Sequence, residues 1–132
     1  MQNVSTQYHE TGNVSFRAAG AVAGKTFVKP SADRTGGPGL STDNENLYVF
    51  STCPAGAKPA GVAKYDVANG EAGGVHGRPG MIVPVKAGAA IVAGVEVEVG
   101  AAGTAITLAS GKAVGLAMSG AANGADAQIK LY

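Results

Sequence analysis

The sequence has no tryptophan, a single cysteine and no long apolar run, and each of these absences excludes a class of protein. A lone Cys53 cannot form an internal disulfide or a metal site built from several cysteines. No apolar run approaches the roughly 20 residues that a membrane-spanning helix needs, so we expect no membrane contact. The N-terminus lacks the charged-then-apolar pattern of a secretory signal, so we expect synthesis in the cytoplasm.

Charged and aromatic residues are also scarce. Ten Lys and Arg oppose nine Asp and Glu, which gives a formal net charge of +1, and the basic residues are scattered singly along the chain. A protein that binds nucleic acid needs a basic surface to neutralise phosphates and often uses aromatic side chains to stack on bases. We therefore exclude nucleic acid as a partner. The 132 residues fit one domain, and their thin core of Val, Ile, Ala and Leu favours additional burial against partners.

The sequence contains one unit twice. Residues 14–28 match residues 83–97 with one residue inserted, and residues 61–63 (GVA) recur as residues 115–117 (GLA). The shared positions are glycines of turns and valines of strands, not reactive polar groups. The repeat therefore predicts a duplicated β scaffold with a structural or binding role.

Short apolar alternations, separated by Gly-rich and Asn-Gly turns at intervals of about 8–12 residues, predict an all-β fold. The expected strands are 14–17, 26–28, 47–52, 61–65, 81–85, 95–99, 104–108, 114–118 and 128–131. Many short strands of this kind favour a small barrel or a sandwich. Only residues 87–93 have a helical composition, which their flanking glycines limit to about one turn.

Two segments are not explained by the repeat. Residues 1–12 are polar and predict an extended N-terminal arm. Residues 30–59 are punctuated by Pro and Gly and predict a long insertion, with 47–52 as a strand at a sheet edge. The expected organisation is an arm at 1–12 and one β domain at 13–132 that contains the insertion 30–59.

Residues 19–26 (AGAVAGKT) fit a relaxed phosphate-loop pattern, which requires a helix that begins at the Lys-Thr pair. Strand-forming residues follow instead, and Pro30 would end any helix within a turn. The second copy keeps the turn and lacks the Lys-Thr pair. A structural turn is therefore the better interpretation, and we expect no nucleotide or other cofactor.

The remaining candidates for catalysis are few. Cys53 with His9 or His76 could supply a nucleophile and its base, but the histidines lie in polar or Gly-rich segments without a recognisable signature. Glu96 and Glu98 project from one strand face, where paired carboxylates could serve a glycosidase or a metal ion. We interpret them as the solvated face of a half-buried strand. We therefore expect no enzymatic activity and no metal site.

Several apolar motifs point to a known family. The motifs are residues 12–14, 21–24, 61–63, 90–97, 114–117 and 127–131. This series resembles the small capsid cement, or head decoration, proteins of tailed bacteriophages, which show a Gly-Val-Ala strand, an Ala/Gly turn before a Val strand, a late Val-Gly-x-Ala strand and a closing Val/Ile-x-Leu. The resemblance covers 10–29 and 60–132 and fails across 30–59.

The resemblance implies a small β-barrel (β-tulip-like) fold, here built from a duplicated β unit, without enzymatic activity. It implies a virion protein on the outer capsid surface, made in the host cytoplasm. It also implies homotrimers at threefold and quasi-threefold positions that bridge neighbouring major capsid proteins and stabilise the expanded shell.

We expect residues 1–12 and 30–59 to make the contacts between subunits, because arms and long loops can add to a neighbour's surface. The candidate contact residues are Tyr8, His9, Arg34, Leu47, Tyr48, Phe50 and Arg78.

Two alternatives stay open. The first is a tail or fibre-associated β module that binds other virion components or a host glycan. The second is an enzyme or carrier domain of the lipoyl or biotinyl type, which also uses small duplicated β units. That class needs an exposed Lys at a hairpin tip, and neither Asn69-Gly70 nor Asn123-Gly124 carries one.

Overall fold

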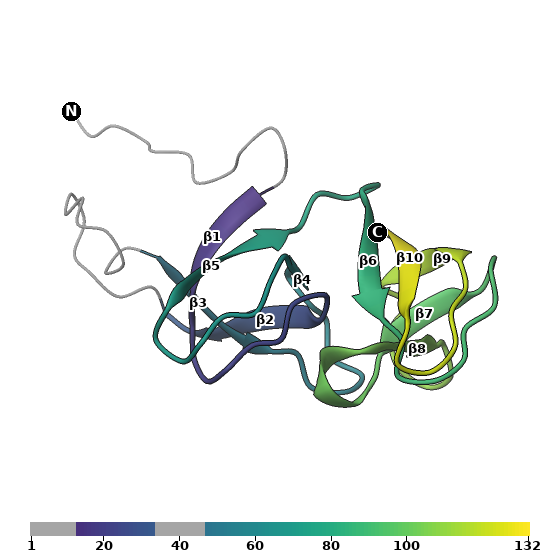
Figure 1. The fold of residues 1–132 in the computed structure, drawn as a ribbon, viewed down its shortest axis with the longest axis horizontal. Helices are drawn as coiled ribbons and strands as arrows, with labels where there is room; N and C mark the ends of the chain where they lie inside the picture. The colour runs from purple at the N-terminus through teal and green to yellow at the C-terminus, as the bar shows by residue number, and fades with distance from the viewer. Residues whose placement is uncertain (1–12, 34–46) are drawn as a thin grey trace.

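Ten strands form two successive units in the computed structural model, which describes residues 13–33 and 47–132 (Figure 1). The first unit contains β1 (Asn13–Ala18), β2 (Phe27–Ala32), β3 (Tyr48–Thr52), β4 (Gly61–Ala63) and β5 (Ala72–His76). The second contains β6 (Ile82–Lys86), β7 (Glu96–Val99), the short 3₁₀ turn η2 (Ala101–Gly103), β8 (Ala105–Thr107), β9 (Gly115–Ser119) and β10 (Asp126–Leu131). The all-β prediction is confirmed.

The first unit is a closed barrel, as the sequence predicted. Its strand order is β1-β3-β2-β4-β5, and β1 pairs with β5 to close it. β1 and β3 are parallel, and the other pairs are antiparallel. β3 has a partner on each side, so the prediction that 47–52 forms an edge strand was wrong.

The strands of the second unit pair in the same cyclic order as those of the first. Its sheet has the order β6-β10-β9-β7-β8, and a parallel bridge between Ala87 and Ala105 links β6 back to β8. The equivalent parallel contact in the first unit pairs Ala18 with Phe50. Ala87 therefore belongs to an extended pairing, and the expectation of a helical turn at 87–93 was wrong.

Hydrogen bonds fix the alignment of the two copies. Val22 and Val67 exchange two backbone hydrogen bonds, and Ile91 and Ala121 exchange the equivalent pair. The N–H of Lys25 donates to the carbonyl oxygen of Ala63, and the N–H of Gly94 donates to the carbonyl oxygen of Ala117 in the same way. Lys25 therefore takes the place of Gly94, and both adopt the left-handed backbone region, with φ of 62° and 88°. The one-residue insertion inferred from the sequence does not exist at this turn.

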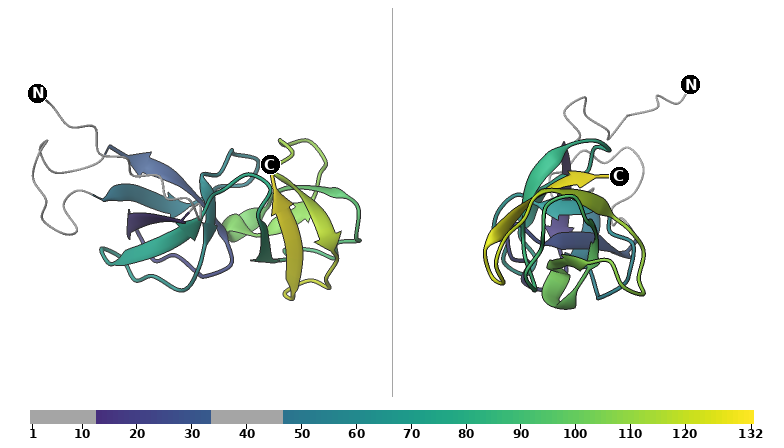
Figure 2. Two further views of the ribbon diagram at one scale, coloured as in Figure 1. Left: turned by 90° about the horizontal axis from the view of Figure 1, so that it is seen from above. Right: turned by 90° about the vertical axis from the view of Figure 1, so that its right-hand side faces the viewer.

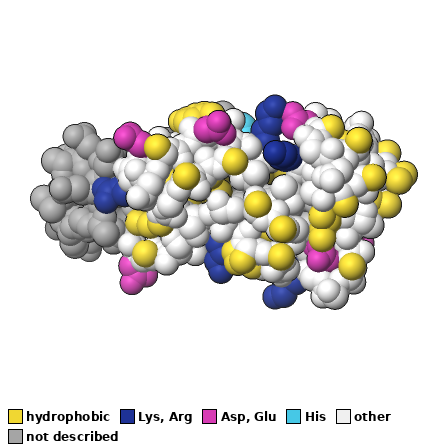
Figure 3. Space-filling model, turned by 60° about the horizontal axis from the view of Figure 1, so that its bottom comes forward, with side chains coloured by type: hydrophobic (Ala, Val, Ile, Leu, Met, Phe, Trp, Pro, Cys, Tyr) yellow, Lys and Arg dark blue, Asp and Glu magenta, His cyan; other side chains and the backbone are white. Residues whose placement is uncertain are grey.

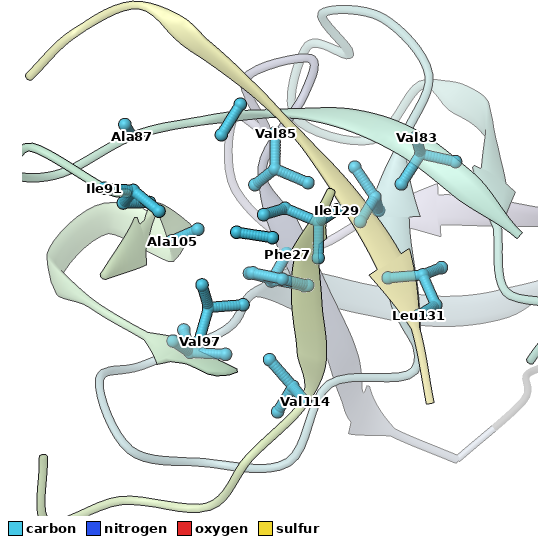
Figure 4. Close-up of a cluster of buried hydrophobic side chains, with 14 of the residues drawn as sticks. Phe27, Val83, Val85, Ala87, Ile91, Val97, Ala105, Val114, Ile129 and Leu131 are labelled. Carbon is cyan, nitrogen blue, oxygen red and sulfur yellow. The ribbon is translucent and has the colours of Figure 1, made fainter. Parts of the chain in front are cut away.

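The units lie end to end along the long axis, and two views of the molecule agree on this arrangement (Figure 2). The first barrel holds its own cluster of buried side chains, which includes Phe16, Val28 and Phe50. A larger cluster fills the second unit and also takes in three residues of the first, Phe27, Cys53 and Val62. Phe27 lies among the side chains of the second unit in Figure 4. The hydrophobic core thus continues across the junction.

Polar contacts cross the same junction. The N–H of Gly56 donates to the carbonyl oxygen of Val99 over 2.9 Å. The N–H of Lys86 donates to the carbonyl oxygen of Lys25 over 2.8 Å. The Lys25 side chain also forms an ion pair of 2.6 Å with Asp126. That pair is half exposed and contributes about 0–1 kcal/mol, so buried apolar area carries most of the attachment. The single-domain organisation stays a prediction.

The two copies differ in length at one connection. In the second unit, Val99 reaches Ala105 through η2, whereas in the first unit the equivalent residues are Pro30 and Phe50. The extra residues therefore fall between Pro30 and Phe50. β3 and the loop that follows it belong to the repeated unit, although both fall within the 30–59 range assigned to an insertion. The expected arm at 1–12 and residues 34–46 lie outside the described residues.

Candidate functional site

A groove of about 290 Å³ opens at the junction of the two units. Its walls are residues 58–61, which lead into β4, Gly77 after β5, residues 112–114 before β9 and residues 131–132 at the end of β10, with Phe27 also lining it. We call it the inter-unit groove. The C-terminus of the chain lies at this junction in both Figure 1 and Figure 2.

The duplication builds the two main walls of the groove. Gly61 pairs with Val28 as Gly115 pairs with Val97, so residues 58–60 correspond to residues 112–114. One lysine from each copy, Lys58 and Lys112, therefore sits at the same position of its unit. Both side chains are exposed.

Glycine is required where each wall joins its strand. A Cβ at Gly61 would overlap the carbonyl oxygen of His76 on β5. A Cβ at Gly115 would lie 2.5 Å from Cγ2 of Ile129 and 2.7 Å from the carbonyl oxygen of Lys130, both on β10. The recurring glycine thus lets the strand after each lysine loop approach its neighbour closely, which the repeated GVA and GLA motifs reflect.

Glu98 supports the wall that carries Lys112. Its side chain is only 6% exposed, and its Oε2 accepts hydrogen bonds from the N–H groups of Ala109 at 2.6 Å and Gly111 at 2.9 Å. The expectation that Glu98 faces solvent was wrong, because the loop after β8 folds over it. These backbone hydrogen bonds, the one from Ala109 foremost, lower the pKa of the carboxyl group.

Glu98→Gln should lower the Tm at about pH 7 by a few degrees, because the amide cannot replace a carboxylate that accepts several N–H groups. A lowered pKa means that this stabilisation is present above the ordinary glutamate pKa and is lost as the pH falls through the lowered value. The difference in Tm between the variant and the wild type should therefore shrink from about pH 7 to about pH 3. Thermal melts across that range measure it.

Glu96→Gln is the matched control, because Glu96 lies on the same strand with an exposed side chain. It should leave the pH profile of the Tm close to that of the wild type. Parallel profiles for Glu98→Gln and the wild type would contradict the assigned role of Glu98.

The end of β10 forms the remaining wall of the groove. The hydroxyl group of Tyr132 donates to Oε2 of Glu96 over 2.9 Å, which raises the pKa of that hydroxyl. Glu96 thus faces solvent, as expected, while Glu98 does not. The two carboxylates do not act as a pair, since each has a different partner.

The residues expected to contact partners do not gather at this groove. Leu47 is half-buried just before β3, and Tyr48 stacks on Phe50 with ring centroids 6.4 Å apart. Phe50 itself is 6% exposed and stacks on Phe16 at 5.5 Å, so the structure places it in the core instead of on a contact surface. Tyr8, His9 and Arg34 lie outside the described residues.

Arg78 is exposed in the turn between β5 and β6, where its carbonyl oxygen accepts from the N–H of Met81. It follows Gly77 but does not line the inter-unit groove. Sequence reasoning missed Lys58 and Lys112. The signal was available, because each repeated Gly-Val/Leu-Ala motif is preceded by a lysine three residues earlier.

No reactive constellation assembles among the described residues. Cys53 is fully buried, and burial raises the pKa of its thiol, which disfavours the nucleophilic thiolate. His76 is half-buried, and burial lowers its pKa. Residues 13–33 and 47–132 contain no group of three His, Cys, Asp or Glu placed to hold a metal ion.

The same two ranges contain no helix with the length and hydropathy to cross a membrane.

A two-unit β scaffold with a surface groove defines a structural or binding module. The chain belongs to the phage cement protein family, whose sequence model matches residues 6–132. The resemblance seen in the apolar motifs is thereby confirmed, and the chain is a structural protein associated with the phage virion. No curated protein matches the chain.

The fold is similar to that of a solved structure, the N base of the head fibre gp8.5 of bacteriophage phi29. The TM-score is 0.72 over 91% of this chain and 92% of that chain, with 22% sequence identity. The likeness therefore covers both units and not one barrel alone.

Proposed function

We propose that this protein binds the outer surface of the phage capsid at threefold and quasi-threefold positions. There it bridges neighbouring major capsid proteins and stabilises the expanded shell. The observation that carries the proposal is the match to the cement family over residues 6–132, which includes both units. Surface binding also suits a chain whose charges are dispersed over the face seen in Figure 3, without one dominant basic or acidic patch.

The physical reason for such a role is multivalent clamping. A protein that binds the expanded lattice and not its precursor stabilises the expanded state by mass action. A homotrimer, which we propose as the bound form, would contact several capsid subunits at once, so that its overall affinity exceeds that of each contact. Neither effect requires a reactive group.

The proposed contacts include residues 1–12 and the connection between β2 and β3. β3 is a central barrel strand, so we place the proposed contacts of this connection in the residues that precede β3. Leu47 and Tyr48, both half-buried at the base of that connection, remain candidate contacts.

Co-sedimentation with expanded shells that lack this protein tests the proposal. We expect saturable binding with a stoichiometry near the number of threefold and quasi-threefold positions, and weaker binding to unexpanded shells. Bound shells should also resist heat or denaturant better than bare shells, because the bound state is favoured by mass action. The absence of binding to any shell would overturn the proposal.

The likeness to a head fibre base favours a second candidate function, in which the protein anchors another appended component to the virion. Electron cryomicroscopy of labelled virions distinguishes the two. Label at many threefold positions supports the cement role, whereas label at a few sites that each carry a protruding component, or at the tail, supports the anchor.

A further inference from the structure

We propose that the inter-unit groove docks an extended acidic segment of the capsid surface, and that Lys58 and Lys112 bind its carboxylates. The inference rests on the proposed function, since it names the chemistry by which that shell would be recognised. The groove would then be a contact site built by the duplication itself.

The charge of the groove supports an acidic occupant. Lys58 and Lys112 carry the charged side chains among the residues that line it, and no acidic side chain lines it. Among the described residues, the ion pair that forms is Lys25 with Asp126, so neither groove lysine forms an ion pair with a carboxylate of the described chain. Two exposed lysines without an ion-pair partner among the described residues attract carboxylates both in the encounter and in the bound state.

The shape of the groove favours an extended segment over a folded element. Its volume of about 290 Å³ is at the small end for a binding site, which suits a few side chains. Most of the other lining residues are small or apolar, including Pro59, Ala60 and Ala113. In an extended segment, successive side chains point to opposite sides, so some can contact the apolar wall while the others reach the lysines.

The two lysine loops are held in place before any partner arrives. The loop that precedes Lys58 is tied to the second unit by the hydrogen bond from Gly56 to Val99. The loop that precedes Lys112 is tied to Glu98 through Ala109 and Gly111. Because the backbone is already ordered at both lysines, binding costs less conformational entropy than docking on free loops.

The test uses two double variants of the full chain with the same change in net charge. Lys58→Glu/Lys112→Glu reverses the groove, and Lys86→Glu/Lys130→Glu reverses two exposed lysines on β6 and β10. Thermal melts establish that both variants fold. In co-sedimentation with expanded shells at low salt, the groove variant should bind at least about tenfold more weakly than the wild type, with a weaker salt dependence. The control variant should bind like the wild type.

If the wild type binds shells and both variants bind equally well, the groove proposal is overturned while the cement function stands. If the wild type binds no shell, the proposed cement function is overturned. The groove proposal is then tested by peptide binding to the isolated protein. A short synthetic peptide of alternating Asp and Val, titrated into ¹⁵N-labelled protein, should then shift the amide signals of Lys58, Lys112 and Gly77 saturably. The same peptide with Lys in place of Asp should not. No saturable shift with the acidic peptide would overturn the groove proposal independently.

Discussion

Replacing Phe27 with alanine should lower the free energy of unfolding by about 3–5 kcal/mol, a large part of the roughly 5–15 kcal/mol that holds a typical domain together. Phe27 starts β2 of the first unit, yet its fully buried ring packs in the cluster that fills the second unit. The truncation therefore leaves a cavity at the junction, where the units are joined mainly by apolar contact (Figure 4). Urea unfolding followed by circular dichroism measures the loss.

Phe27→Leu is the control, because a smaller change in volume should cost less than about 1.5 kcal/mol. Calorimetry of the wild type should show one transition, since the core continues from one unit to the other. A loss below about 1 kcal/mol for Phe27→Ala would contradict the role of the ring. Two separate transitions in the wild type would show that the units fold independently.

Gly120→Ala should destabilise the protein by about 1–3 kcal/mol or more, although it adds a single methyl group. A Cβ at this position would overlap the carbonyl oxygen of Ile91 and would lie 3.1 Å from the backbone nitrogen of Ala93. These contacts are with backbone atoms, which cannot adopt another rotamer as a flexible side chain can. The two segments that cross here must therefore move apart to accommodate the methyl group. Ile91 and Ala121 exchange backbone hydrogen bonds beside this crossing and would be strained with it. The change in urea midpoint measures the effect.

Gly124→Asn serves as the comparison. Gly124 has a φ of 86° and open space where a Cβ would lie, and asparagine tolerates that region better than other residues. This change should cost less than about 1 kcal/mol. Equal costs for the two variants would contradict the assignment of the Gly120 effect to the backbone approach.

The first unit has an equivalent close approach between two backbone segments, but there the glycine lies on the opposite segment. A Cβ at Gly24 would lie 2.8 Å from Cα of Tyr65 and 3.1 Å from the nitrogen of Asp66. Gly24 corresponds to Ala93, and Asp66 corresponds to Gly120. Each close approach thus requires a glycine on one of the two segments, and the two copies carry this glycine on different segments. A residue-by-residue sequence match cannot detect this exchange, because the constraint belongs to the pair of segments.

The sequence determined the parts of this protein that depend on local physics. Alternation of apolar and polar residues placed nearly all of the strands, Asn-Gly turns marked Gly70 and Gly124, and the recurring glycines and valines revealed the duplication. The same apolar motifs were sufficient for the family. These signals are short in range, since strand periodicity and turn chemistry act between neighbours in the chain.

Only the tertiary structure decided which residues meet across long separations. It placed Phe27 in the core of the second unit, Phe50 in the barrel interior and Glu98 beneath a loop that Ala109 and Gly111 close over. It also brought Lys58 and Lys112 to one groove, although 53 residues lie between them in the chain. Burial and electrostatic environment are set by the packing of the two units. A pattern within one strand cannot encode them, because it fixes the face on which a side chain lies and not what covers that face.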